Sequence, residues 1–539
     1  MKLFGTDGIR GKVGEFPITP SDMRKLGYAI AKLIFKDNNT GFIYTSYDGR
    51  ESAVDITCAL LDGLCEQGPS TLSNHHIYSL GLSSTPALSH LLSTTDSRFP
   101  CLGIQITASH NPYQDNGIKI FNGNGLKISE EQEIEIENTF FNIDEKTLIK
   151  QRDWGGSDMA EDAKQLEAYN SSVQYYLADK IKNEVNKKFL IMVDCANGAT
   201  SNHVEDIFNN SDIIDILPIH NNPNGTNIND KCGATHIESL IKEVKSYNNI
   251  NQRKIDLGVA FDGDGDRAIF VTANGGVVDG DEILYILSKF KKDYKNYEGP
   301  VIGTLMTNYG IQSAYKKAGI DFHATNVGDK FVYQKMTDIS AEIGGESSGH
   351  IITTDFIDIP IGDGIITLIN LLEVLSKTEL SLDDFKKIQA NGKIAMKLKN
   401  GNSIVGVKLC NDEDDIMLST NMGKCFRTPV SKLRTTKSRS SMGVRGIKLG
   451  TKDDKVIGML IVKREGSILV TTDKGYGKRS ELSEYRCQNM GGKGVITIKT
   501  TNKVGNLISI MEAIDTDDLM LINDKGIMIR QPVKNIRTI

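Results

Sequence analysis

The sequence predicts several α/β domains followed by an all-β repeat region. The chain has 539 residues, too many for one hydrophobic core, since domains usually contain about 100–200 residues. Residues 1–375 alternate short apolar strands with helical stretches, which is typical of an α/β architecture. After about residue 390 the helical periodicity fades, and short strands recur at an interval of roughly 50 residues.

The composition excludes several classes of protein. Hydrophobic residues make up 39% and charged residues 24% of the chain, a balance that excludes a disordered or fibrous protein. No apolar run approaches the ~18 residues of a membrane span, and the first residues lack the apolar core of a signal peptide. The eight cysteines include no Cys-x-x-Cys pair, which argues against a zinc ribbon or a disulfide framework. We expect a cytoplasmic protein without a membrane partner.

Charge divides the chain into two parts. Residues 385–539 contain 29 lysine and arginine residues against 15 aspartate and glutamate residues, a net charge of +14. Residues 1–384 contain the other 34 basic and 54 acidic residues, a net charge of −20. This asymmetry indicates two units with different partners, the basic unit meeting either nucleic acid or only solvent.

In the acidic part, five segments run from apolar residues into a polar or glycine-rich loop. These segments are 42–46, 102–107, 189–194, 257–262 and 301–305. Helical patterns such as 21–35 and 363–375 lie between them, and the acidic stretch 129–137 predicts a solvated helix. Strand, loop and helix in succession place functional sites at the carboxyl ends of the strands.

In the basic part, the turn glycines Gly423, Gly475 and Gly526 are separated by 52 and 51 residues. Each glycine follows a short strand and a turn that contains Asn or Asp. This period predicts about three blades of a propeller-like β array. A two-layer β domain without repetition is the alternative.

The strongest local signal is Asp262-Gly-Asp-Gly-Asp-Arg267, directly after an apolar strand. Alternate residues of an extended segment point to one side, so Asp262, Asp264 and Asp266 can converge on one hard cation. The two intervening glycines permit the sharp backbone that convergence requires. The loop lacks the glycine and glutamate positions of an EF-hand. A divalent-metal site is predicted, with a solvated acidic turn as the alternative.

A second signal, Thr107-Ala-Ser-His-Asn-Pro112, follows another predicted strand. Ser109 in this loop of small residues is a candidate nucleophile, although a serine at such a place is commonly a turn residue and no Gly-x-Ser-x-Gly elbow surrounds it. Together with an acidic metal loop it indicates phosphoryl transfer, in which a cation neutralises phosphate oxygens while serine carries the group. No Walker loop is present in the sequence, which argues against nucleotide-dependent transfer.

Residues 1–375 resemble the α-D-phosphohexomutase family, because seven motifs occur in that family's order. The motifs are Phe4–Gly11, Thr107–Pro112, Asp115–Lys119, Val193–Gly198, Pro223–Asn229, Asp262–Arg267 and Gly344–His350. The first motif and Val278–Glu282 look most like the phosphoglucosamine mutase branch. The resemblance implies three α/β domains, at 1–150, 151–252 and 253–378. It also implies conversion of glucosamine 6-phosphate to glucosamine 1-phosphate through a bisphosphate, with glucose or mannose phosphates as the alternative substrates.

The resemblance implies roles for individual residues. The expected ligands of Mg²⁺ are Asp262, Asp264, Asp266 and the phosphate carried by Ser109. The expected catalytic residues besides Ser109 are the proton carriers Lys119 and His110 and the cations Arg10 and Arg267. The expected substrate-binding residues are Glu346, Ser348 and His350, the last of which is equally well explained as a loop-packing residue.

The family pattern is incomplete in this chain. Members of the family end in a fourth domain whose Arg-x-Ser-Gly-Thr-Glu-Pro loop holds the phosphate of the substrate. No such sequence occurs in the 539 residues. We therefore expect impaired mutase activity.

Residues from about 381 onward resemble a second family, the C-terminal DNA-wrapping β-pinwheel of DNA gyrase. The similar segments are 392–398, 443–449, 475–479 and 488–496. The resemblance implies that residues 385–539 bind the phosphates of double-stranded DNA, without the DNA-cleavage domain of a topoisomerase. The expected contacts are Lys424, Arg427, Lys432, Arg434, Arg439, Arg445, Lys478, Arg479 and Lys493. The segment 381–385 fits either family, and two partial patterns in one chain indicate a fusion or a chimera.

Overall fold

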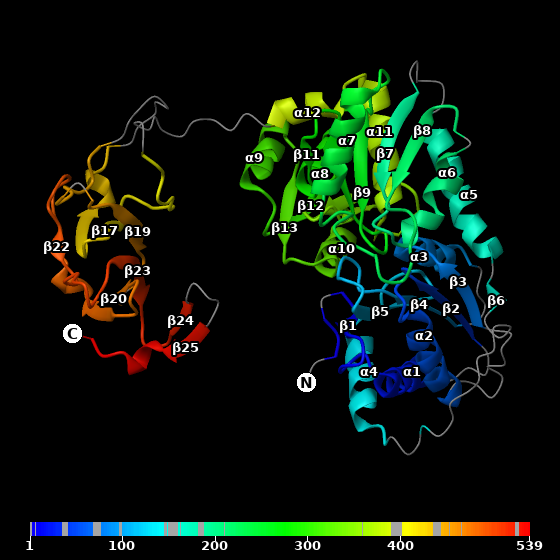
Figure 1. Ribbon diagram of the computed structural model, residues 1–539, viewed down its shortest axis with the longest axis horizontal. Coiled ribbons are helices and arrows are strands. Elements are labelled where there is room, and N and C mark those ends of the chain that lie inside the picture. The colour runs from blue at the N-terminus through cyan, green and yellow to red at the C-terminus, as the bar shows by residue number, and fades with distance from the viewer. Residues whose placement is uncertain are drawn as a thin grey trace. The chain divides into compact units, whose positions relative to one another are not determined.

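The computed structural model describes residues 3–538, apart from 6, 35–40, 68–76, 96–99, 145–147, 149–159, 162, 182–187, 210, 358, 390–401, 435–443, 452, 465 and 523–527. The chain forms two compact units, Met1–Asn391 and Gly392–Ile539. In Figure 1 the first unit runs from blue to yellow-green and the second from yellow to red. Three sheets flanked by helices make up the first unit and antiparallel strands make up the second, which confirms the predicted fold class.

The first α/β layer is a six-stranded sheet in the order β1-β5-β4-β2-β3-β6. Its strands are β1 (Ile9–Lys12), β2 (Phe42–Tyr47), β3 (Ile77–Leu82), β4 (Cys101–Ile106), β5 (Asp115–Asn122) and β6 (Ala160–Glu161). The helices α1 (Pro20–Ile34), α2 (Ala53–Gln67) and α4 (Glu130–Asn142) cover one face, and α3 (Thr85–Thr94) covers the other. The central strands β3, β2 and β4 are parallel, so the loops after β2 and β4 meet at one edge.

The second layer is a five-stranded sheet in the order β11-β10-β9-β7-β8. Its strands are β7 (Phe189–Asp194), β8 (Ile214–Ile219), β9 (Leu257–Phe261), β10 (Ala268–Thr272) and β11 (Val277–Val278). The helix α7 (Glu238–Ile250) packs on one face, and α5 (Ala163–Lys180) and α6 (Val204–Phe208) pack on the other. Because β9 pairs in parallel with β7, this sheet continues to Val278 and past the domain boundary expected at residue 252.

The third layer is a five-stranded sheet in the order β13-β12-β14-β15-β16. Its strands are β12 (Val301–Thr304), β13 (Phe322–Thr325), β14 (Ile343–Gly345), β15 (Ile351–Thr353) and β16 (Ile361–Gly362). The helix α10 (Asp329–Asp338) packs on one face, and α8 (Gly280–Lys295) and α9 (Tyr309–Ala318) pack on the other.

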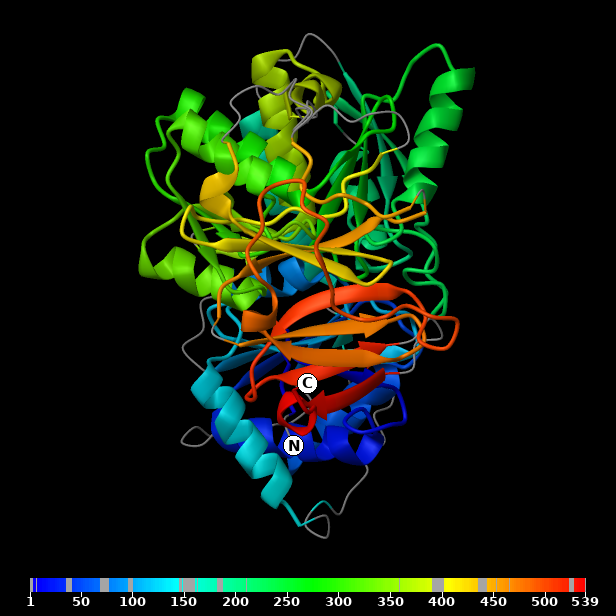
Figure 2. The ribbon, with the colours of Figure 1, turned by 90° about the vertical axis from the view of Figure 1, so that its left-hand side faces the viewer.

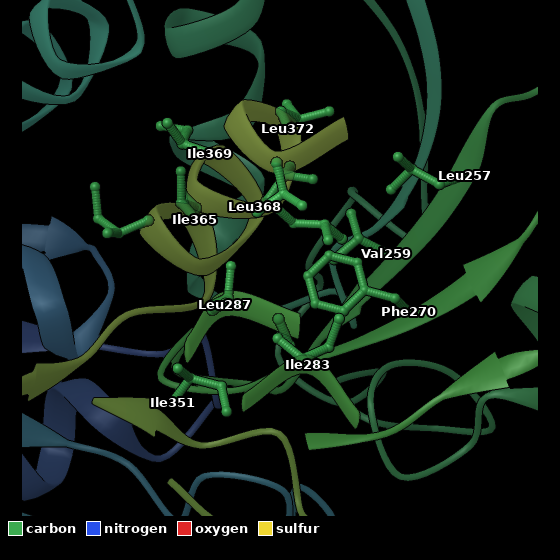
Figure 3. Packing of buried hydrophobic residues seen from close by; sticks show 14 of the residues in the cluster. Leu257, Val259, Phe270, Ile283, Leu287, Ile351, Ile365, Leu368, Ile369 and Leu372 are labelled. Carbon is green, nitrogen blue, oxygen red and sulfur yellow. The ribbon is translucent and has the colours of Figure 1, made fainter. Parts of the chain in front are cut away.

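One buried helix, α11 (Gly364–Thr378), joins the second and third layers. All its residues from Gly364 to Leu375 are buried. Figure 3 shows leucines and isoleucines of α11 packed against β9, β10 and α8. Since burial of one such side chain contributes about 1.5–3 kcal/mol, this packing fixes the helix. Its first amide, on Gly364, donates to the carbonyl of Gly265 at 3.0 Å.

A short helix, α12 (Leu382–Gln389), ends the described part of the first unit. Leu382 is buried in the same core as α11, and Phe385 packs against that core. The segment 381–385, which fitted either family on sequence, therefore belongs to the α/β unit. The boundary between the units lies at residues 391 and 392, after the start at 381–385 that was expected for the basic part.

The described part of the second unit contains three antiparallel hairpins at the predicted period. They are β17–β18 (Asp415–Thr420 and Lys424–Pro429), β20–β21 (Ser467–Thr472 and Gly477–Glu481) and β24–β25 (Asp518–Ile522 and Met528–Pro532). The strands β19 (Val456–Val462), β22 (Val495–Ile496) and β23 (Leu507–Ala513) complete the sheets β19-β17-β18-β22 and β21-β20-β23. Figure 2 shows the sheets stacked in chain order, from yellow through orange to red.

The hairpin turns have the backbone that the repeat predicts. Gly423 and Gly475 both have φ of +77°, in the left-handed region that favours glycine. Gly526 lies outside the described residues.

Arg427 and Arg479 lie at equivalent positions of two hairpins. Each forms hydrogen bonds that link its hairpin to the following repeat. Arg427 donates to Asp415 and to the carbonyls of residues 482 and 485 at 3.1 and 3.3 Å. Arg479 is buried and donates to Ser467, to Asp515 at 2.7 Å, and to the carbonyls of residues 533 and 536 at 3.2 Å. Both guanidinium groups, expected to contact DNA, are thus occupied inside the unit.

We predict that Arg479→Lys loosens the second unit, because one ammonium group cannot replace the several directed donors of the guanidinium. Loss of hydrogen bonds made by a charged group costs about 1.5–3 kcal/mol each. Hydrogen exchange of the full chain should become faster in β20 and β23 and stay unchanged in α11. Lys493→Gln, at an exposed site, is the control. Equal protection in both variants would contradict the structural role.

Candidate active site

The loop after β4 holds Ser109 in a constrained conformation. Ser109 has φ of +53°, which is uncommon for a residue with a side chain, and its amide donates to the Thr107 hydroxyl at 2.8 Å. A left-handed residue of this kind costs of order 1–3 kcal/mol and persists only where its surroundings hold it. The side chain of Ser109 is fully buried.

Arg50, at the end of β2, holds this loop from inside the protein. Its buried guanidinium donates to the carbonyls of residues 109, 111, 112 and 115 at 2.5–3.0 Å. Its Nε atom donates to Asp48 at 2.9 Å. Asn229 also donates to the carbonyl of Ser109, at 2.9 Å. Arg50 was not among the residues predicted from the sequence, although its place after an apolar strand, in Asp48-Gly-Arg50, was an available signal.

The loop after β9 brings three carboxylates together, as the alternation of residues predicts. Oxygen atoms of Asp262, Asp264 and Asp266 lie within 4.8 Å of one another, and all three residues are buried. Gly265 has φ of +77°. A side chain at Gly263 would come within 2.5 Å of the Ser109 carbonyl, so glycine lets the two loops meet.

Two proton acceptors face the Ser109 hydroxyl. It donates to Asp262 Oδ2 at 2.7 Å and lies 3.2 Å from His110 Nδ1. Burial, together with Arg267 and Arg10, lowers the pKa of His110 to about 4, so its ring is neutral near pH 7. Arg267 donates to the same Nδ1 atom at 3.1 Å, which leaves that nitrogen as an acceptor. Burial and the neighbouring carboxylates raise the pKa of Asp262 well above its usual value.

Lys119 is the cation nearest to the carboxylates. Its Nζ atom lies 2.7 Å from Asp264, 2.8 Å from Asp266 and 3.3 Å from Asp7. Burial alone would lower the pKa of Lys119, but these carboxylates raise it well above its usual value. Lys119 is therefore an ammonium group, and Arg10 is brought to the same cluster by its ion pair with Asp7.

The carboxylate loop has the chemistry of a divalent-cation site. The Oδ1 atoms of Asp264 and Asp266 are buried without a hydrogen-bond partner. Carboxylate oxygens are the donors that Mg²⁺ and similar hard cations prefer. The residues present thus fit a divalent metal ion.

A cavity of about 420 Å³ lies beside this cluster, between the first and third layers. Asp266, Lys127, Asp329, Lys330 and His350 are among its lining residues. Lys127 forms ion pairs with Asp7 and Asp329, and the lining as a whole offers both lysine and carboxylate groups to a ligand. This cavity is the candidate substrate pocket.

The predicted substrate-binding residues are only partly assembled at the cavity. His350 Nδ1 lies 3.7 Å from Asp266 Oδ1, which links the β14–β15 loop to the carboxylates. Burial lowers the pKa of His350, but Asp266 raises it above its usual value overall. Glu346 accepts a hydrogen bond from the amide of Gly328 at 2.8 Å, and Ser348 is half-buried in the same loop.

In the second unit, the structure separates the expected DNA contacts into groups. The exposed residues are Lys432, Arg434, Arg445 and Lys493. Lys424 and Lys478 are half-buried. Arg427 and Arg479 hold the repeats together, and Arg439 lies outside the described residues.

Comparison with known proteins agrees with both resemblances. The phosphoglucomutase/phosphomannomutase family models for α/β/α domains I, II and III match residues 1–147, 167–276 and 279–392. A phosphoglucosamine mutase of Haemophilus ducreyi is 38% identical over 384 residues, which cover 71% of this chain and 80% of that protein. The chain belongs to the phosphoglucomutase/phosphomannomutase family. The family model for the DNA gyrase C-terminal domain, a β-propeller, matches residues 380–411, 414–463, 466–512 and 517–539.

Other relatives extend this result. Phosphoglucosamine mutase 2 of Shewanella frigidimarina is 34% identical over 420 residues, covering 78% of this chain and 87% of that protein. A putative phosphomannomutase of Thermus thermophilus has the same fold, with a TM-score of 0.58 at 22% identity over 72% of this chain and 83% of that one. Within the described residues, no helix combines the length and apolar character needed to cross a membrane.

We predict that Arg50→Met frees the Ser109 loop. Methionine cannot donate to the four carbonyls, and it leaves the buried Asp48 without its cation, a change that costs about 3–5 kcal/mol. Amides 107–116 should exchange faster in the variant. Arg253→Met removes an exposed arginine that donates to Asp215 and to the carbonyls of residues 188 and 189, and should leave the loop unchanged. Equal protection of the loop in both variants would refute the role of Arg50.

Proposed function

We propose that the first unit is a phosphoglucosamine mutase, which interconverts glucosamine 6-phosphate and glucosamine 1-phosphate. The observation that carries this proposal is the contact of Ser109 with Asp262, 2.7 Å long, at a buried group of three carboxylates. The names of the relatives from Haemophilus and Shewanella support the choice of glucosamine phosphate over other phosphosugars.

In this proposal Ser109 carries the phosphoryl group. A hydroxyl oxygen of the sugar phosphate bonds to phosphorus while the bond from phosphorus to Ser109 Oγ breaks, and a bisphosphate results. The other phosphate of the bisphosphate then returns to Ser109. In this return step the neutral ring of His110 accepts the proton of the Ser109 hydroxyl, since its Nδ1 atom lies 3.2 Å from Oγ, and the sugar oxygen released from phosphorus takes up a proton.

The cations of the site stabilise charge on the transferred group. Mg²⁺ held by Asp262, Asp264, Asp266 and the Ser109 phosphate would neutralise phosphate oxygens when bound. Arg10 and Arg267 contribute positive charge beside the serine. The ion pairs of Lys119 make it a fixed cation in this arrangement, whereas the sequence suggested a proton carrier. Glu346, Ser348 and His350 would bind the sugar.

We predict slow mutase turnover, which Ser109→Ala reduces to the assay background. Slow turnover is expected because the 539 residues contain no Arg-x-Ser-Gly-Thr-Glu-Pro loop, and binding energy at the non-reacting phosphate normally supports positioning at the reacting centre. The measurement is a coupled mutase assay on the full chain, beside a version extended with a phosphate-binding domain.

Ser313→Ala, on α9 and away from the cluster, is the matched control and should keep the activity. Mutase activity that survives Ser109→Ala would contradict the assignment of Ser109 as the nucleophile. Turnover by the unextended chain equal to that of its extended version would mean that other residues hold the second phosphate.

A second candidate function, binding of double-stranded DNA, concerns the second unit. It rests on the net charge of +12 in residues 392–539, which contain 27 basic and 15 acidic residues, and on the exposure of Arg434, Arg445 and Lys493. Lys424 and Lys478 would add contacts. Lysine and arginine on turns contact phosphates without reading bases.

A cytoplasmic location stays a prediction of the sequence.

We predict DNA affinity that falls steeply with salt, with a slope of log K against log[salt] of about −0.9 for each phosphate neutralised. Joint replacement of Arg434, Arg445 and Lys493 by alanine should reduce this slope by about 3. Lys242→Ala, at an exposed position of α7, is the control. If the affinity of the full chain for DNA did not change with salt concentration, this result would contradict electrostatic binding to phosphates.

A further inference from the structure

Three segments of the second unit occupy the same place in successive repeats. They are Ile404–Cys410, Val456–Val462 (β19) and Leu507–Ala513 (β23), which are separated by 52 and 51 residues like the turn glycines. Each segment precedes a hairpin by the same number of residues. We call them the leading segments of the first, second and third repeats.

The structure shows what a leading segment does. The leading segment of the second repeat, β19, pairs antiparallel with β17 in the hairpin of the first repeat, and Val462 lies opposite Asp415. In the same register, β23 pairs with β20 in the hairpin of the second repeat, and Ala513 lies opposite Ser467. Each leading segment thus completes the sheet of the repeat before it.

Among the described residues, one leading segment and one hairpin lack the partner that this rule gives to the others. Residues 404–410 are exposed, belong to no helix or strand, and have no strand partner among the described residues. Leu409 is 94% exposed, whereas Ile461, at the equivalent position of β19, is 6% exposed. The apolar segment 404–410 therefore lacks a sheet of the kind that β19 and β23 join.

At the other end of the stack of sheets, β24 pairs only with β25 among the described residues (Figure 1). The equivalent strands β17 and β20 each have a neighbour on both sides. Met520 and Ile522 of β24 are 56% and 68% exposed. An open strand edge with apolar side chains is a template for pairing with another strand.

We propose that the leading segment 404–410 of one chain pairs with the open edge of β24 in a second copy of the chain. The register of the two completed sheets places Cys410 opposite Asp518, Leu409 opposite Leu519 and Val407 opposite Leu521.

Reciprocal exchange makes the assembly a closed dimer. In two copies that exchange these segments, each described open edge of β24 receives the leading segment 404–410 of the other copy. The described repeats of the two second units then join as six in one ring, within the range of about 4–8 blades found for propellers.

The register gives a direct test by disulfide cross-linking. Asp518→Cys is made in the full chain with Cys487→Ser, which removes the other exposed thiol. Isotope-labelled and unlabelled chains are mixed and oxidised with diamide. Antiparallel neighbours have Cα atoms about 4.5–5.5 Å apart, which a disulfide spans. We expect a disulfide between the peptide that contains Cys410 of one chain and the peptide that contains the new cysteine at position 518 of the other, with one peptide labelled and the other unlabelled.

Met520→Cys in the same background is the matched control, because the register places residue 408 opposite it and its thiol should cross-link much less with Cys410. Cross-links found only within single chains, or equal yields from the two variants, would overturn the proposal.

The second measurement is the mass of the unmodified protein in solution. The wild type should sediment as a dimer of 59.3 kDa chains, and Leu409→Pro should give a monomer, because proline removes a donor from the exchanged strand. Leu409 is exposed in the single chain, so this substitution leaves its fold intact. A wild type that remains monomeric, or a proline variant that remains dimeric, would contradict strand exchange.

Discussion

Burial of three neighbouring carboxylates, at Asp262, Asp264 and Asp266, is the constraint on which the first unit depends. Buried charges are tolerated only when they are paired or bind a metal ion. The structure meets this requirement with Lys119 from the first layer and leaves two carboxylate oxygens for a cation. Every layer must therefore be in place before this loop is stable, since its compensating groups come from distant parts of the chain.

Backbone contacts from all three layers converge on this loop. Thr85, at the start of α3, donates its amide to the Asp264 carbonyl at 2.9 Å. The amide of Ala268 donates to Gly349 in the third layer, and the amide of Gly364, the first residue of α11, donates to Gly265. The apolar packing of α11 between two sheets thus bears directly on the position of the carboxylates. Ser109, held by Arg50, completes the cluster from the first layer.

Much of the fold and part of the site follow from local sequence patterns. The strands before both functional loops and the convergence of the carboxylates depend on residues one or two positions apart. Arg50 was missed because its four acceptors are backbone carbonyls about sixty residues away. Every residue has a backbone carbonyl, so the sequence does not show which of them accept hydrogen bonds. The same reason explains Arg427 and Arg479, whose basic side chains resemble DNA contacts until their internal acceptors are seen. The end of the first unit was placed too early because Leu382 is recognisable as a core residue only from the packing of α12.

The most direct test of the central account is to locate the phosphate on the protein. The full chain is incubated with Mg²⁺ and glucosamine 1,6-bisphosphate labelled in its phosphates, and the labelled peptide is sequenced by mass spectrometry. The account predicts label on Ser109, and loss of that label in Asp262→Asn, which removes a carboxylate that faces the serine. Label on another residue, or labelling of Ser109 that does not depend on Asp262, would contradict it.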